Sequence, residues 1–118
     1  GMGLEASRHR FGYRILCHVF QLCSMDDPSV ATLVDEVLPD AADLSGHRFG
    51  NHVVRHILQH GLDRHKEQVA RALSGWYLEA YATHPHGSRV VELALLECQM
   101  QDRLQIAKAL LCISKPLA

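Results

Sequence analysis

A fifteen-residue block that occurs three times constrains the fold of this chain more than any other feature. The copies span residues 9–23 (HRFGYRILCHVFQLC), 47–61 (HRFGNHVVRHILQHG) and 84–98 (HPHGSRVVELALLEC), so successive copies lie 38 and 37 residues apart. A constant period of this length is typical of proteins built from stacked repeats. We therefore expect a linear array of similar units, each packing mainly on its neighbours.

Each block has apolar residues at the spacing of one face of an α-helix. In the three copies they are Ile15, Leu16, Val19 and Phe20; Val53, Val54, Ile57 and Leu58; and Val90, Val91, Ala94 and Leu95. A variable polar triplet lies on the other side of each predicted helix. The triplets are Tyr13, Arg14 and Cys17; Asn51, His52 and Arg55; and Ser88, Arg89 and Glu92. These triplets are the candidate functional residues.

The segments between the blocks also predict helices. Asp26, Asp27 and Pro28 are typical of a helix start, because proline at the first turn has no N–H group to leave unpaired. Pro39 predicts the end of that helix, and residues 40–45 are long enough for one short helix before the second block. Asp63 predicts the cap of the next helix, which Ser74 and Gly75 end.

In the last third of the chain, residues 76–83 predict a short helix and residues 100–112 the final one. We expect Trp76, Tyr77 and Tyr81 to pack between repeats, with a role for one of them as a stacking platform for a base as the alternative. Residues 1–8 are too few for a complete helix ahead of the first block. No segment alternates in polarity with a period of two, so we expect an all-α array with approximate repeats 1–38, 39–75 and 76–118.

The composition fits a single intracellular domain. With 118 residues, 47% of them hydrophobic and 21% charged, the chain has ample material for a core and too few charges for disorder. Its four cysteines form no C-x-x-C pair, and the sequence contains neither a secretory segment nor an 18-residue apolar run. We expect reduced thiols and no association with membranes.

The charge is distributed unevenly. The net charge is −1, yet the three blocks contain five arginines against two glutamates and eight of the nine histidines. This asymmetry predicts one basic face, which is typical of proteins that bind nucleic acid.

Catalytic and metal-binding patterns are weak. His56 and His60 have the spacing of a zinc-binding helix but lack an evident third ligand. Cys17 and His18 are neighbours that point about 100° apart on a helix, so the imidazole cannot readily activate the thiol. We expect no enzyme activity, cofactor, metal or small-molecule substrate. His9, His47 and His84 each precede a glycine by three residues, and we expect them to cap or pack the helix starts.

The segments HRFGNHVVRHILQHG and HPHGSRVVE resemble the RNA-facing helix of Pumilio (Puf) repeats, in which an aromatic residue or histidine and a glycine precede five reading positions. The resemblance covers essentially the whole chain, although only the blocks are specific. It implies a right-handed α-solenoid of three-helix Puf-type repeats that binds single-stranded RNA, such as mRNA, in antiparallel orientation. It also implies post-transcriptional regulation of translation in the cytoplasm, with a nuclear or nucleolar location left open.

The resemblance assigns the triplets different roles. Ser88, Arg89 and Glu92 match the family's guanine-reading triplet. Asn51, His52 and Arg55 match the uracil triplet only in asparagine, which leaves a pyrimidine as the preferred base. Tyr13, Arg14 and Cys17 fit no known base code, although Arg14 could stack on a base.

Two further expectations concern partners. Because Tyr13 and Cys17 do not fit a base code, a protein-binding α-solenoid without base-specific RNA recognition is the alternative function. Neither end of the array resembles a polar capping unit, so we expect self-association through the uncapped ends. Gly1 before Met2 is typical of a cleaved tag, and we expect this chain to be part of a longer protein.

Overall fold

The computed structural model describes residues 2–75 and 78–114, and within them it contains helices and turns and no strand. The helices are α1 (Met2–Arg8), α2 (Gly12–Leu22), α3 (Pro28–Val37), α4 (Ala41–Ser45), α5 (Gly50–His60), α6 (Asp63–Leu73), α7 (Leu78–Ala82), α8 (Gly87–Glu97) and α9 (Met100–Ser114), with a 3₁₀ turn at Leu38–Asp40. The all-α prediction is confirmed. None of these helices has the length and apolarity needed to cross a membrane.

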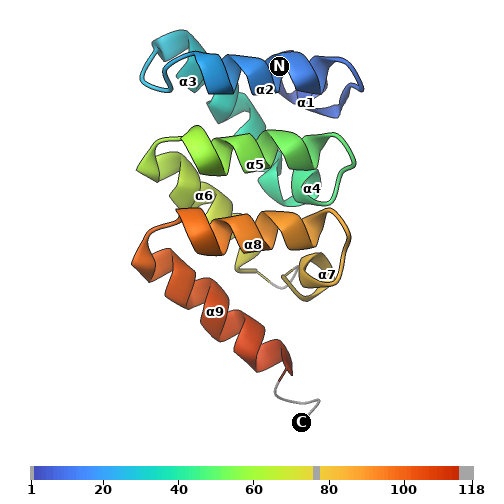
Figure 1. Ribbon diagram of the computed structural model, residues 1–118, viewed down its shortest axis with the longest axis vertical. Coiled ribbons are helices and arrows are strands. Elements are labelled where there is room, and N and C mark those ends of the chain that lie inside the picture. Colours follow the sequence, from blue (N-terminus) through green and yellow to red (C-terminus); the bar gives the residue numbers. More distant parts are fainter. Residues whose placement is uncertain (1, 76–77, 115–118) are drawn as a thin grey trace.

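The helices form three stacked units in an elongated array of 46 × 27 × 19 Å. Figure 1 shows α2, α5 and α8 one below another, with the short helices α1, α4 and α7 at one end of them, α3 and α6 behind, and α9 running down below α8. The helix α5 packs against both α2 and α8, so the three repeated blocks form one continuous surface. The array is therefore an α-solenoid with the polar triplets on equivalent helices.

The middle block shows why the array is stable. Val53, Val54, Ile57 and Leu58 are all fully buried, because repeats cover α5 on both sides. Burying a side chain of this size stabilises the fold by roughly 1.5–3 kcal/mol. Ile15, the equivalent of Val53 in the first block, is 67% exposed. The difference arises because no described helix covers that side of α2.

Histidines cap the inner helices as predicted. His47 Nδ1 accepts hydrogen bonds from the backbone N–H groups of Phe49 and Gly50, at 3.1 and 3.0 Å. His9 and His84 form the same pair of bonds at the starts of α2 and α8. These bonds satisfy N–H groups that the first turn of a helix leaves unpaired.

The start of α3 follows its prediction, and two other helix starts do not. Asp27 caps α3 by accepting a hydrogen bond from the Ser29 backbone N–H at 2.8 Å. The start of α6 differs, because Asp63 is its first helical residue and the Leu62 N–H donates to His65 Nδ1 at 3.1 Å. Residues 2–8 form the helix α1. The expectation that they were too few was wrong, because the short helices of this fold need only one or two turns.

Tyr81 of α7 packs between repeats as predicted. Its ring is 9% exposed, and its hydroxyl donates a hydrogen bond to the Ala42 carbonyl of α4. Trp76 and Tyr77 lie outside the described residues.

Candidate nucleic-acid interface

The second and third triplets border two neighbouring hollows between α5 and α8. The larger hollow has a volume of about 620 Å³, and all three residues of the third triplet line it. It is lined by Arg55, Gln59, Pro85, Ser88, Arg89, Glu92, Leu93 and Leu96. The smaller, of about 250 Å³, contains all three residues of the second triplet and is lined by Asn51, His52, Arg55, Pro85, His86 and Arg89. Because Arg55 and Arg89 line both hollows, the two triplets form one continuous site.

The third triplet presents open side chains. Arg89 and Glu92 are exposed and Ser88 is half-buried on α8. Ser88 and Glu92 are four residues apart, so they project side by side from one face of the helix. Opposite them on α5 lie Arg55 and Gln59, also four residues apart. The larger hollow therefore has hydrogen-bonding groups on both sides.

The second triplet is partly engaged with its own helix. Asn51 is 1% exposed, and its Nδ2 donates to the carbonyls of His47 and Arg48 at 2.8 and 3.0 Å. Its Oδ1 accepts a hydrogen bond from Arg55 Nη1 at 3.5 Å. Its position in the triplet had suggested an exposed polar side chain. Asn51 is buried instead. Its bonds fix the start of α5 and orient Arg55 toward the hollows.

His52 lies among positive charges. Burial lowers the pKa of its imidazole below 6.5, and the nearby cationic groups of Arg55, His86 and Arg89 lower it further. Since a neutral imidazole stacks readily on a base and adds no repulsion toward these arginines, His52 is suited to stacking at neutral pH.

The first triplet turns toward protein rather than toward open space. The ring of Tyr13 stacks on Phe49 and His52, with centroid distances of 5.2 and 5.3 Å and interplanar angles of 12° and 23°. Cys17 is 8% exposed, and burial raises the pKa of its thiol to about 11. Arg14 is exposed and borders neither of the two hollows. Of the first triplet, only Arg14 is open to a ligand.

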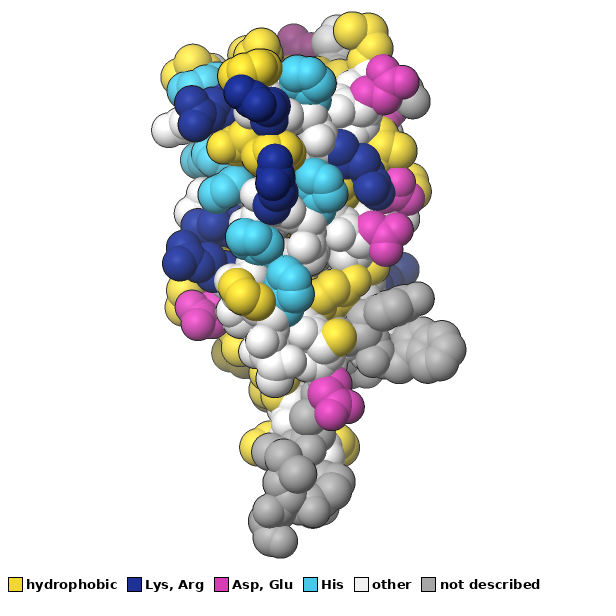
Figure 2. Space-filling model, turned by 90° about the vertical axis from the view of Figure 1, so that its right-hand side faces the viewer, with side chains coloured by type: hydrophobic (Ala, Val, Ile, Leu, Met, Phe, Trp, Pro, Cys, Tyr) yellow, Lys and Arg dark blue, Asp and Glu magenta, His cyan; other side chains and the backbone are white. Residues whose placement is uncertain are grey.

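Basic side chains extend along the helix starts beside this site. Figure 2 shows histidine and arginine side chains gathered on the side of the array where the inner helices begin. Arg10 and Arg48 lie over the rings of Phe11 and Phe49, 4.6 and 4.5 Å from the centroids. Stacking on a ring holds a guanidinium group in place while leaving its N–H groups available. The predicted basic face is present.

Sequence reasoning did not identify Gln59, His86 or the apolar residues of the larger hollow. Two signals could have found the polar ones. Gln59 follows Arg55 by one helical turn, and His86 occupies the position of Phe11 and Phe49 in the other blocks. Leu93 and Leu96 line the site only because α5 and α8 lie side by side, which a single helix does not reveal.

Comparisons with known proteins agree with this geometry. The family model for the Pumilio-family RNA binding repeat matches residues 40–74 and 80–111. A search of curated proteins by sequence finds no match.

Solved structures share the fold. The Puf4 RNA-binding domain bound to the HO endonuclease RNA 3′ UTR recognition sequence is similar with a TM-score of 0.85 and 26% identity, over 98% of this chain and 35% of that chain. The Puf3 RNA-binding domain bound to Cox17 RNA 3′ UTR recognition sequence site A has a TM-score of 0.82 and 22% identity, over 93% and 31%. The RNA-binding domain of yeast Puf5p bound to SMX2 RNA has a TM-score of 0.78 and 18% identity, over 92% and 31%. The present chain spans about a third of the length of each of these chains.

Proposed function

Because the chain belongs to the Pumilio family of RNA-binding repeats, we propose that it binds single-stranded RNA sequence-selectively across the two hollows between α5 and α8. The observation that carries the proposal is the convergence of Ser88, Arg89 and Glu92 in one open hollow with donors from α5 opposite. Single-stranded RNA suits this surface, because its unstacked bases offer both a hydrogen-bonding edge and a face for stacking.

The third repeat reads guanine in this proposal. The Glu92 carboxylate accepts hydrogen bonds from guanine N1–H and from the exocyclic amine, which adenine does not present in that arrangement. Ser88 supplies a hydroxyl to the same base edge. The guanidinium plane of Arg89 stacks on the base, and a stacked base contributes roughly 1–3 kcal/mol.

The second repeat contacts the next base toward the 3′ end of the RNA. Asn51 Nδ2 is already bonded to backbone carbonyls, so the edge contact falls mainly to Arg55, whose donors suit the oxygen acceptors of a pyrimidine. His52, which Tyr13 supports from the other side, stacks on the base. The first repeat packs against the second and contributes Arg14 alone.

In the cell, this activity would serve post-transcriptional regulation of mRNA in the cytoplasm. Three repeats contact only a few bases, so we expect a single copy to bind weakly, and tight binding to need additional repeats.

The proposal is tested by selection from a random pool of single-stranded RNA. The wild-type chain should enrich a short motif with guanine, and a variant with Ser88, Arg89 and Glu92 all replaced by alanine should lose that guanine. A variant with Gln68, Glu79 and Gln105 replaced by alanine, all exposed and outside both hollows, serves as the control. Absence of any enrichment by folded wild-type protein at high concentration would overturn the proposal.

A further inference from the structure

The junction between the first and second repeats has an aromatic ring at the place where the next junction has the smaller hollow. The helix α5 packs against α2 and α8 alike, so the lining of that hollow can be shifted by one repeat to find the equivalent positions between α2 and α5. These positions are Tyr13, Arg14, Cys17, Arg48, Phe49 and His52. The difference between the two junctions therefore lies in their side chains.

Tyr13 is the side chain that distinguishes the first junction. Its equivalent, Asn51, is 1% exposed and donates to backbone carbonyls at the start of its own helix, so it borders the smaller hollow without filling it. The ring of Tyr13 instead stacks on Phe49 and His52, with centroid distances of 5.2 and 5.3 Å. A phenol ring thus lies among the positions that surround open space one repeat further on.

Tyr13 also contacts both side chains that could stack on a base at the first repeat. The smaller hollow has His52 from one repeat and Arg89 from the next. One repeat earlier, the same two positions are Arg14 and His52. The Arg14 guanidinium lies 5.9 Å from the centroid of the Tyr13 ring, and Arg14 Nε donates to the Tyr13 hydroxyl at 3.4 Å. Both stacking groups therefore already have a partner within the protein.

The interactions of the Tyr13 ring are those that a base would make. A nucleobase is also a flat ring with a polar edge, and it stacks on histidine and arginine side chains. The position that could contact the base edge is closed as well, because Cys17 stands where the second repeat has Arg55 and is 8% exposed.

We propose that the ring of Tyr13 occupies the place of a base at the first repeat and keeps RNA bases out of it. Of the three repeats, only the second and third then stack a base. Replacing Tyr13 by a small residue opens a further base-binding position between Arg14 and His52. This inference rests on the proposed function, because it concerns the same RNA.

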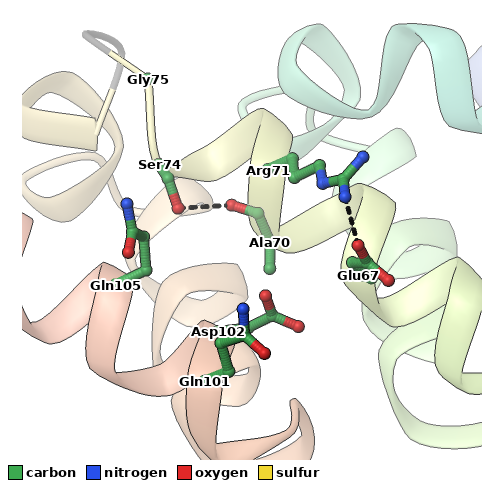
Figure 3. Close-up of a pocket in the computed structure, with 8 residues that line it drawn as sticks. All are labelled: Glu67, Ala70, Arg71, Ser74, Gly75, Gln101, Asp102 and Gln105. Carbon is green, nitrogen blue, oxygen red and sulfur yellow. Dashed lines mark hydrogen bonds and ion pairs between the residues drawn. The ribbon is translucent and has the colours of Figure 1, made fainter.

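The outer helices provide a control position. Figure 3 shows a hollow of about 410 Å³ between α6 and α9. Arg71 pairs there with Glu67, and the Ser74 hydroxyl donates to a carbonyl of its own helix. Among the described residues that line this hollow, none has a ring on which a base could stack. Gln101 is exposed there, so its replacement should not alter base stacking.

The test uses abasic substitutions, which remove a base and keep its ribose and phosphate. The probe is a short single-stranded RNA with guanine for the third repeat, uracil for the second and adenine for the first, in the 5′ to 3′ direction. Competition binding followed by fluorescence anisotropy gives the affinity for the intact RNA and for each abasic form. The ratio of these affinities within one protein cancels any general loss of affinity in a variant.

In the wild type, an abasic site in place of guanine or uracil should weaken binding about fivefold or more, the lower bound for a stacked base. An abasic site in place of adenine should leave the affinity unchanged. In Tyr13→Ser, which introduces the residue type of Ser88, loss of the adenine should weaken binding about fivefold or more. Tyr13→Phe, which keeps the ring, and Gln101→Ala should both show the wild-type pattern.

Two results would overturn the inference and leave the proposed function intact. One is a wild-type affinity that depends on the adenine as strongly as on the guanine, and the other is a folded Tyr13→Ser that does not respond to loss of the adenine. If Tyr13→Ser fails to fold by circular dichroism, Tyr13→Asn, with the residue type of Asn51, replaces it. Abasic sites without effect at both guanine and uracil in the wild type would overturn the proposed function and the inference together.

Discussion

At the residue scale, equivalent positions of the repeated block serve different purposes. The first triplet position holds Tyr13, which stacks on protein rings, Asn51, which binds backbone carbonyls, and Ser88, which is open. The fifth reading position holds a buried thiol at Cys17 and an open carboxylate at Glu92. In the proposed function, recognition of a base edge is therefore concentrated in the third repeat, where both positions face a hollow.

Replacing Glu92 by glutamine should relax the preference for guanine. The amide has a single oxygen acceptor and adds donors that repel guanine N1–H, so discrimination against adenine should fall about tenfold or more, given roughly 1–3 kcal/mol for a paired contact. Competition binding with short RNAs that differ at one base measures the ratio. Glu97→Gln on the same helix, which borders neither hollow, is the control and should keep the wild-type ratio. Unchanged discrimination in Glu92→Gln would contradict the assignment.

His65 should make stability depend on pH. Its side chain is fully buried, Nδ1 accepts a hydrogen bond from Leu62 N–H, and Nε2 lies 4.0 Å from Asp35 Oδ1. Burial lowers the pKa of His65 below 6.5, with Arg64 adding to this effect and Asp35 opposing it. The unfolded chain therefore takes up a proton first as pH falls below 6.5, and the free energy of unfolding decreases until the folded state is protonated as well.

Urea unfolding at pH values from about 7.5 to 5.5 tests this linkage. His65→Gln, which retains a side-chain acceptor for Leu62 N–H, should show a shallower fall in stability on acidification than wild type. His47, His52 and His56 also have lowered pKa values, so part of the dependence should remain. An identical slope in His65→Gln would show that this histidine does not contribute.

At the scale of elements, close approach between short and inner helices fixes the repeat. A Cβ atom added at Gly87 would lie 2.9 Å from the Cα and carbonyl oxygen of Tyr81. Both of these atoms belong to the backbone of α7, so relief requires α7 and α8 to move apart. The glycine therefore permits the tight turn from short helix to inner helix.

Gly87→Ala should accordingly destabilise the fold by about 1–3 kcal/mol, the usual cost of overpacking, despite the higher helix propensity of alanine. Chemical denaturation gives the free energy of unfolding. Gly75→Ala is the matched control, because its nearest atom within reach, the Ala72 carbonyl oxygen, is 3.9 Å from the added Cβ. Equal stability of the two variants would mean that α7 shifts without cost.

At the scale of the whole molecule, the net charge is −1, while histidine and arginine side chains gather over the starts of the inner helices. Electrostatic attraction to RNA therefore depends on the local field of that region. The convergence of Arg55 and Arg89 at both hollows places this field where the RNA is proposed to lie.

Binding of RNA should weaken as salt is added. The logarithm of the association constant should fall linearly with that of the salt concentration, with a slope of roughly −0.7 for each phosphate that a basic side chain neutralises. Fluorescence anisotropy with a labelled single-stranded RNA measures the slope, with a duplex of the same sequence as the control. Salt-independent binding would instead favour apolar docking of the kind expected for a protein-binding solenoid.

The sequence by itself determined the repeat, the inner helices and the histidine caps. These features are local: a period of 37 or 38 residues, an apolar spacing of one helical turn, and a histidine three residues before a glycine all act within a single unit. The assignment of guanine to the third triplet rests on its resemblance to the Puf motif and stays a prediction.

The tertiary structure decided what depends on neighbouring repeats. Ile15 and Val53 occupy the same position in their blocks. Val53 is buried because a neighbouring repeat covers it, and Ile15 is exposed because none of the described helices covers it. Likewise Tyr13 is engaged because Phe49 and His52 of the next repeat stand beside it. Burial and stacking are relations between units, so a pattern read within one unit cannot supply them.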